Sequence, residues 1–281
     1  MRLYVRLFSQ DWVGHGSECF LAVSRNVLVT IFSLAVCVTS HAQFTTIAYD
    51  GFNYSAGSLA GQNGGTGWTT PWALTYFSGG NLGVSTTGLS YAGLATTGGS
   101  IVWSSGGNGI SEDSRSLSLL DSGVVYIQFL SQFGSSSGGG TPNIRLFDSG
   151  TLTGGFGGNG GTHGTVMSIL DTTLNPASDG SSSSSASLSA LNFVVARIDH
   201  QNNVTAMWVN PNLSTFDYQN PGTPDATYAG LAPAFDSLAI YSRNPANLDE
   251  IKIMWESVPE PPSILFFGVG ILILYGLRRR H

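Results

Sequence analysis

The sequence predicts an all-β domain, a two-sheet antiparallel β-sandwich, with a signal helix before it and one transmembrane helix after it. Three observations favour this prediction. Short runs rich in β-branched and aromatic residues recur through residues 44–255. Asn-Gly and Asn-Asn pairs separate the runs and supply the positive φ angles that tight turns need. No helical periodicity lasts longer than a few residues in this region.

The front of the chain has the three parts of a secretory signal. Arg25 precedes an apolar run at 27–38, and Ser-His-Ala follows at 40–42. The run is too short for an ordinary transmembrane helix, so we expect signal peptidase to cut between Ala42 and Gln43. The polar residues before Arg25 fit a signal poorly, which favours a translation start near Val23.

The back of the chain combines a proline-rich segment, an apolar run and a cationic end. Prolines at 259, 261 and 262 prevent a helix from extending upstream of the run at 263–277, and Arg278, Arg279 and Arg280 hold its end in the cytoplasm. At ~1.5 Å per residue the run covers roughly 22 Å of a hydrocarbon core of about 30 Å. Helix physics alone leaves a plain membrane anchor as an alternative.

The residues at 258–281 resemble the PEP-CTERM sorting domain of Gram-negative bacteria. The resemblance rests on Pro259, Glu260 and Pro261 ahead of the apolar run and the arginines, and Pro262 departs from it because the family usually has a small residue there. It implies that these three residues are recognised by exosortase, a membrane protease-transpeptidase, which eventually removes the anchor. The chain then divides into a signal segment (1–42), a sandwich (43–257) and a sorting segment (258–281).

The charge of the domain argues against a nucleic-acid partner, and its cysteine content argues against a disulfide. Between residues 43 and 257 five cations face 14 carboxylates. No basic patch is available to displace counterions from phosphates, so we expect no nucleic-acid partner. Cys19 and Cys37 both precede the predicted cut, so the mature chain has no disulfide.

The strongest strand pattern predicts a hairpin and a closing strand. Residues 191–199 and 204–209 flank a Gln-Asn-Asn turn, and both faces of the first strand are largely apolar, which indicates an inner strand. The closing strand at 248–255 places Asp249, Ile251, Ile253 and Trp255 on the face predicted for the core.

Two passages resemble a laminin G-like, concanavalin-type jelly roll. They are Tyr-Asp-Gly-Phe at 49–52 with the glycine-rich stretch 61–68, and Trp-Val-Asn-Pro at 208–211 with Leu-Asp-Glu-Ile at 248–251. The resemblance implies a fold rather than an activity.

Catalytic patterns are weak, and we predict no enzyme. A glycosidase of this fold needs two carboxylates on one strand face about 5 to 9.5 Å apart. Asp249 and Glu250 point to opposite faces, and the pair at 112–113 is interpreted as solvated charge in a turn-like stretch. The Gly-Ser-rich match at 134–138 and the glycine-rich match at 155–160 lack the following helix that a nucleophile elbow or a phosphate site requires.

Two binding hypotheses remain open. Trp68, Trp72 and Tyr76 are candidates for a sugar-stacking platform, with core packing as the favoured alternative. Asp50 and Asp249 are candidates to share a calcium ion at the sandwich edge, with turn capping as the commoner role of such aspartates. No other cofactor is expected.

The sequence therefore supports two functions. The first is a non-enzymatic exported protein, anchored transiently in the inner membrane by its C-terminal helix and then placed in the cell envelope or the extracellular matrix. The second is a carbohydrate-binding module that acts on exopolysaccharide, a partner suggested by family association alone.

Overall fold

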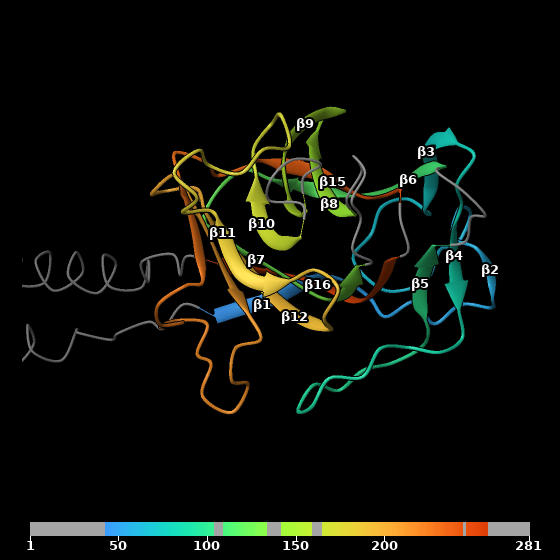
Figure 1. Cartoon of the computed structure of the whole chain (residues 1–281), viewed down its shortest axis with the longest axis horizontal. Coiled ribbons are helices and arrows are strands. Elements are labelled where there is room, and N and C mark those ends of the chain that lie inside the picture. The colour runs from blue at the N-terminus through green and yellow to red at the C-terminus, as the bar shows by residue number, and fades with distance from the viewer. Residues whose placement is uncertain (1–42, 104–108, 134–141, 159–164, 244–245, 258–281) are drawn as a thin grey trace, which may run out of the picture. The chain divides into compact units, whose positions relative to one another are not determined.

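The computed structural model describes residues 43–103, 109–133, 142–158, 165–243 and 246–257, which form strands, turns and bends with no helix. The strands make two antiparallel sheets, so the predicted two-sheet sandwich is confirmed. In Figure 1, β8, β9 and β15 lie above β7, β12 and β16. The predicted signal and transmembrane helices lie outside the described residues, and no described helix is long and apolar enough to span a membrane.

The larger sheet has nine strands. Its order is β14 (Ala226–Ala229), β13 (Val204–Val209), β12 (Asn192–Asp199), β7 (Val124–Phe133), β16 (Ala246–Ser257), β5 (Ser100–Trp103), β4 (Leu82–Ser85) and β2 (Gly57–Ser58), with β1 (Gln43–Asp50) paired to β16. The second sheet has seven strands. Its order is β11 (Ser183–Ser187), β10 (Val166–Leu170), β9 (Thr151–Gly157), β8 (Asn143–Asp148), β15 (Phe235–Ser242), β6 (Ile110–Leu120) and β3 (Ala73–Ser78).

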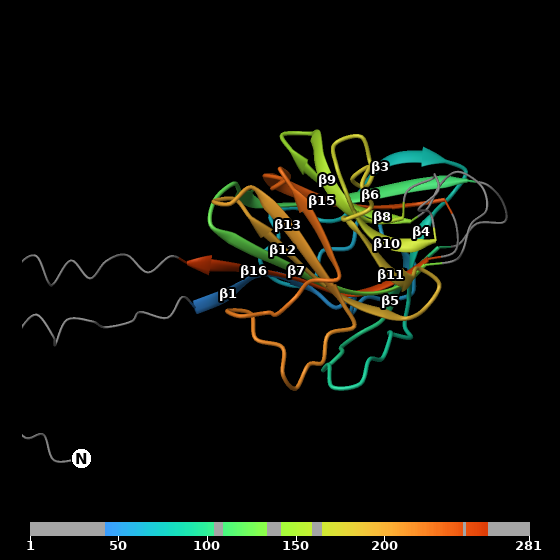
Figure 2. The ribbon, with the colours of Figure 1, turned by 60° about the vertical axis from the view of Figure 1, so that its left-hand side comes forward.

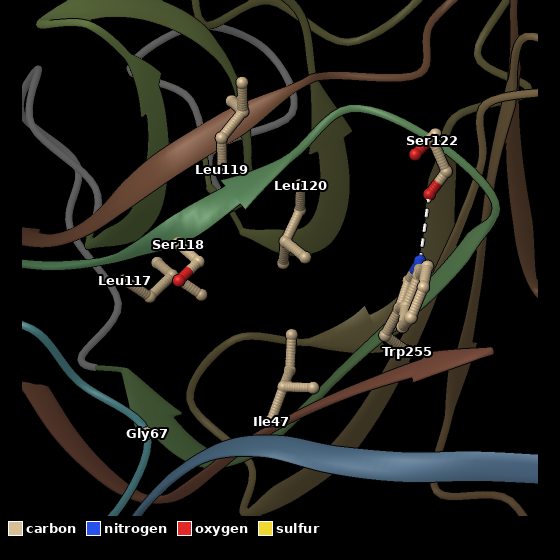
Figure 3. A pocket seen from close by; sticks show the side chains of 8 residues that line it. All are labelled: Ile47, Gly67, Leu117, Ser118, Leu119, Leu120, Ser122 and Trp255. Atoms are coloured by element: carbon tan, nitrogen blue, oxygen red, sulfur yellow. Dashed lines mark hydrogen bonds between the residues drawn. The ribbon is translucent and has the colours of Figure 1, made fainter. Parts of the chain in front are cut away.

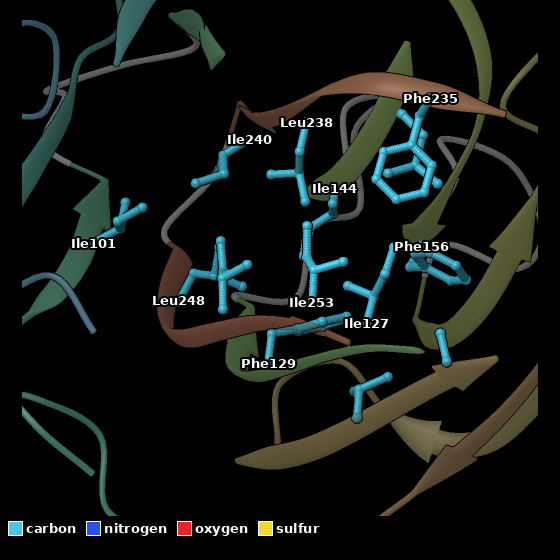
Figure 4. Packing of buried hydrophobic residues seen from close by; sticks show 14 of the residues in the cluster. Ile101, Ile127, Phe129, Ile144, Phe156, Phe235, Leu238, Ile240, Leu248 and Ile253 are labelled. Carbon is cyan, nitrogen blue, oxygen red and sulfur yellow. The ribbon is translucent and has the colours of Figure 1, made fainter. Parts of the chain in front are cut away.

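The main core lies between the two sheets. Ile144 and Leu238 of the seven-stranded sheet point towards Ile127 and Ile253 of the nine-stranded sheet (Figure 4), and all four are fully buried. Alternate residues of each strand contribute to this layer because successive side chains of a strand point to opposite faces. Burial of this apolar surface supplies the main driving force for folding.

A second apolar layer covers the outer face of the nine-stranded sheet. Tyr126, Phe193 and Trp208 project from that face and pack against two long connections, 86–99 and 210–225. Tyr91 of the first connection lies 5.6 Å from Phe193 between ring centroids, and Phe216 of the second lies 5.8 Å from Trp208. Figure 2 shows both connections below the sheet. This face is therefore closed by aromatic packing.

The predicted hairpin is confirmed, with β12 between β13 and β7. Asp199 pairs with Val204 across the turn, and Asn203 adopts a φ of 51°. Val194 lies in the main core and Phe193 in the outer layer. Both faces of β12 are covered, which explains why both are apolar.

The predicted alternation of the closing strand is wrong at its start. A register shift falls between Asp249 and Lys252, and Glu250 has a φ of 55°. This β-bulge inserts a residue and reverses the alternation before it. Leu248 consequently faces the core together with Ile251 and Ile253, while Asp249 contacts the connection 86–99.

The glycine-rich stretch 61–67 lets the chain pass close to β1. Thr66 and Tyr49 exchange two backbone hydrogen bonds of 2.9 Å each. Gly67 has a φ of 79°, and a Cβ atom there would lie 1.7 Å from the carbonyl oxygen of Ile47. Only glycine fits such a contact.

Candidate functional site

The two ends of the sandwich leave it side by side. β1 begins at Gln43, the residue that the predicted signal cleavage exposes, and β16 ends at Ser257, directly before the predicted sorting segment. Gln43 and Ser257 are register partners in the antiparallel β1–β16 pair. Ala42, the sorting residues Pro259, Glu260 and Pro261, and the arginines Arg278, Arg279 and Arg280 lie outside the described residues.

An apolar cleft of about 400 Å³ opens near this end (Figure 3). Ile47 of β1 and Trp255 of β16 form one wall, and Leu120 of β6 faces them. The indole nitrogen of Trp255 donates a hydrogen bond of 3.1 Å to the carbonyl oxygen of Ser122, which fixes the ring beside the β6–β7 turn. The lining holds no ionisable side chain, so the cleft can accept an apolar group but offers no acid or base.

The three aromatic residues predicted as a stacking platform do not share one exposed surface. Trp72 is 1% exposed and donates from its indole nitrogen to Asp50, at 2.9 Å. Trp68 is half-buried and packs against Trp72, with 6.1 Å between ring centroids. Tyr76 is 52% exposed. Core packing therefore describes Trp72, and Tyr76 is the one free to stack on a ligand.

Asp50 has a structural partner that the sequence analysis missed. Arg115 of β6 forms an ion pair of 2.7 Å with Asp50, and both side chains are at most 2% exposed. Tyr54 and Trp72 also donate to Oδ2 of Asp50, while the backbone nitrogen of Phe52 donates to Oδ1. The sequence signal that could have found this pair is Arg115 itself, one of only five cations in an acidic domain. An arginine buried in such a domain requires a carboxylate partner.

Asp249 and Glu250 fasten the connection 86–99 to the bulge of β16. Oδ2 of Asp249 accepts from the backbone nitrogen of Leu89 at 2.8 Å. Glu250 accepts from the backbone nitrogen of Thr97 and, at 2.6 Å, from the hydroxyl of Tyr49. Burial raises the pKa of Asp249 to about 7, and burial with the Glu250 hydrogen bond raises the pKa of Tyr49 to about 12.

These contacts do not fit the predicted calcium pair. Asp50 already faces a guanidinium, and Asp249 uses its two oxygens on the backbone nitrogens of Leu89 and Glu250. A calcium site needs six to eight oxygen ligands turned towards one point. No group of three or more His, Cys, Asp or Glu side chains suited to a metal occurs among the described residues.

A polar and aromatic row crosses the outer face of the seven-stranded sheet. The interpretation of residues 112 and 113 as solvated turn charges is wrong, since both lie in β6 and are at least nine-tenths buried. Glu112 forms an ion pair of 2.7 Å with Arg145 of β8, whose guanidinium stacks 3.6 Å from the ring centroid of Tyr241. Tyr76 and Tyr241 are the cross-strand neighbours of Glu112 on its two sides.

Asp113 points the other way, into the space between the sheets. It is fully buried, and its Oδ2 has no hydrogen-bond partner among the described residues. Burial raises its pKa to about 6, although Ser111 donates to Oδ1 at 3.3 Å. The nearby Glu112 charge raises the pKa further. Asp113 is therefore a buried ionisable group that a ligand at the surface does not reach.

The fold and its paired ends define a two-sheet β-sandwich joined directly to a C-terminal segment. That segment, residues 257–280, matches the PEP-CTERM protein-sorting motif. The predicted resemblance is thereby confirmed, and the chain carries a sorting signal of this class. No curated protein sequence matches the chain.

Several solved structures are similar to the sandwich at low identity. The cellulose-induced protein Cip1 is 14% identical, with 65% of this chain and 90% of that chain covered and a TM-score of 0.42. The exoplasmic/lumenal domain of VIP36 in its Ca²⁺-bound form is 10% identical, with 68% and 86% covered and a TM-score of 0.41. A sialidase is 9% identical at a TM-score of 0.38, and the match covers 67% of this chain but only 17% of that chain's length.

Proposed function

We propose that this chain is a non-enzymatic exported protein whose β-sandwich is displayed outside the inner membrane and released from its anchor by exosortase. One observation carries the proposal. Gln43 and Ser257 are paired, so the predicted signal cut and the sorting motif meet at the same end of one domain.

The engagement of Glu112 and Glu250, the two glutamates a hydrolase of this fold would draw on, supports a non-enzymatic role. Glu112 is engaged by Arg145, and Glu250 is engaged by Tyr49 and Thr97. The cleft beside Trp255 has no ionisable lining.

Mass spectrometry of both termini of the exported product tests the proposal. We expect the mature chain to begin at Gln43 and to lose its apolar tail in a host that has exosortase. In a matched host without exosortase the tail should remain. Replacing Pro259 and Pro261 together by alanine should also leave it attached. Recovery of an intact chain with Met1 and His281 from the cytosol would contradict the proposal.

A second candidate function is polysaccharide binding by the outer face of the seven-stranded sheet. The exposed ring of Tyr76 favours it, because Tyr76 lies beside Glu112 in a row that ends at Tyr241, on whose ring the Arg145 guanidinium stacks. Aromatic rings stack on sugar faces, and guanidinium N–H groups donate hydrogen bonds to hydroxyl oxygens. Gel retardation by a panel of polysaccharides tests it, with Tyr76→Ala and Tyr241→Ala expected to abolish retardation and Leu119→Ala, at an exposed site in β6, expected to keep it. Equal mobility in every gel would rule it out.

A further inference from the structure

β3 is an open edge strand with an apolar surface. In the described part of the chain it pairs with β6 alone, and all six of its residues are exposed. Leu74, Tyr76 and Phe77 are 47%, 52% and 62% exposed. An edge strand presents unpaired backbone N–H and C=O groups, so apolar side chains there mark it as a site for pairing with another strand.

The surroundings of β3 carry no charge that would repel a second strand. Residues 68–83 contain no Asp, Glu, Lys or Arg. Of the two nearest carboxylates on β6, Glu112 is neutralised by Arg145 and Asp113 is fully buried. Natural proteins usually protect such an edge with lysine, proline or a covering loop.

The opposite edge of the same sheet differs in composition. β11 has the sequence Ser-Ser-Ser-Ala-Ser, with no large apolar side chain to bury. In the larger sheet, the edge strands β14 and β2 have four and two residues. The third, β1, has eight, but its exposed residues are Gln43, Thr45 and Thr46, and Tyr49 bonds the backbone of Thr66 on its open side. β3 is therefore the described edge best suited to hold a partner strand.

We propose that β3 of one copy pairs antiparallel with β3 of a second copy, which joins two seven-stranded sheets across a twofold axis. Residues 43–257 contain 14 carboxylates and five cations, so charge repulsion limits where a second copy of this acidic domain can bind. Two copies repel each other over most of their surface and approach at least cost along an uncharged strip. An antiparallel strand pair about a twofold axis is self-complementary, so each copy offers the same backbone groups and apolar side chains.

The expected affinity follows from the size of the contact. A six-residue strand pair buries less surface than the roughly 1,200 Å² of a standard stable interface, so the dimer should be weak in dilute solution. Display on a membrane or in a matrix raises the local concentration towards the millimolar range. This last step rests on the proposed function, whereas the pairing itself does not.

Cysteine cross-linking of the exported, processed protein tests the pairing. The chain from Gln43 onwards has no cysteine, so a single introduced thiol reports one contact. Tyr76→Cys, in the middle of β3, should give a disulfide-linked dimer under mild oxidation. Ser185→Cys, exposed on β11, is the matched control and should stay monomeric. Equal cross-linking of the two variants, or none in either, would overturn the proposal.

Sedimentation equilibrium gives an independent readout without cysteine. The unmodified protein should self-associate as its concentration approaches about 1 mM, and Leu74→Lys with Tyr76→Lys should weaken that association at least tenfold. Ser183→Lys with Ser185→Lys on β11 should leave it unchanged. A monomer at every concentration, or loss of association only in the β11 variant, would refute the pairing. Intact mass identifies the termini separately, so failure of processing is distinguishable from failure of pairing.

Discussion

Arg115 and Asp50 form an ion pair of 2.7 Å that ties the two sheets together at the end of β1. Asp50 belongs to the nine-stranded sheet and Arg115 to the seven-stranded sheet. The guanidinium also lies 5.2 Å from the ring centroid of Trp68, and its Nε donates to the carbonyl oxygen of Thr70 at 2.8 Å. The buried guanidinium of Arg115 therefore connects β6 to β1 of the opposing sheet and to the loop that holds Trp68 and Thr70.

Removing one partner of this pair should strongly destabilise the domain. Asp50→Ala leaves Arg115 buried without its counter-charge, which costs about 3–5 kcal/mol of unfolding free energy. Arg197→Ala is the comparison and should cost less, because Arg197 is 27% exposed and its partner Asp199 keeps two hydrogen bonds from Asn202. Urea unfolding measures both. Similar losses in the two variants would show that the buried pair is dispensable.

The contribution of Asp249 to stability should fall as pH rises from about 4 to about 7. Asp249 holds its proton up to a pKa of about 7 in the folded chain, against 3.8 as the ordinary value. Between these pH values the folded state binds more protons at Asp249 than the unfolded state, so the contribution of Asp249 to stability is fully present below about pH 4 and is lost by about pH 7. Asp113, with a pKa raised to about 6, contributes in the same direction.

Asp249→Asn tests this assignment, because an amide cannot titrate. Melting temperatures from pH 4 to pH 8 should decline less steeply in the variant than in the unmodified protein. His200 acts in the opposite direction, since burial lowers its pKa, so the comparison is made between variants at each pH. A variant with an unchanged slope would show that Asp249 does not titrate in this range.

The bulge carboxylate Glu250 should control the order of the connection 86–99. Glu250→Ala removes the acceptor for Thr97 and Tyr49, so amide hydrogens near Thr97 should exchange faster. Glu256→Ala, further along β16, should leave that exchange unchanged. Hydrogen exchange read by mass spectrometry makes the comparison. Equal protection in both variants would mean that Asp249 and the ring contact of Tyr91 with Phe193 hold the connection without Glu250.

The fold class, the hairpin β12–β13 and the sorting segment were accessible to sequence reasoning because each depends on local patterning. Phe193 and Val194 are adjacent apolar residues, which predicts that both faces of the strand are buried. The turn depends locally on Asn203, which adopts a positive φ. The bulge at Glu250 could not be predicted from the local sequence pattern. A single inserted residue changes the alternation without changing composition.

Ion pairs between residues far apart in the chain were also not predicted from the sequence. Glu112 was misplaced because its counterpart, Arg145, lies 33 residues away and outside the local sequence. The same holds for Asp50 and Arg115, which are 65 residues apart. Charges read as solvated from local context are buried when a distant strand supplies their partner.

The aromatic residues near β3 should separate into one that folds the domain and one that does not. Trp72→Ala should cost about 3–5 kcal/mol, because it leaves a core cavity and an unfilled acceptor on Asp50. Tyr76→Ala should change the unfolding free energy by less than about 0.5 kcal/mol, since its ring is 52% exposed. Chemical denaturation measures both. A large loss at Tyr76 would mean that its ring packs in solution, which would also remove it from the stacking row and from the open edge of β3.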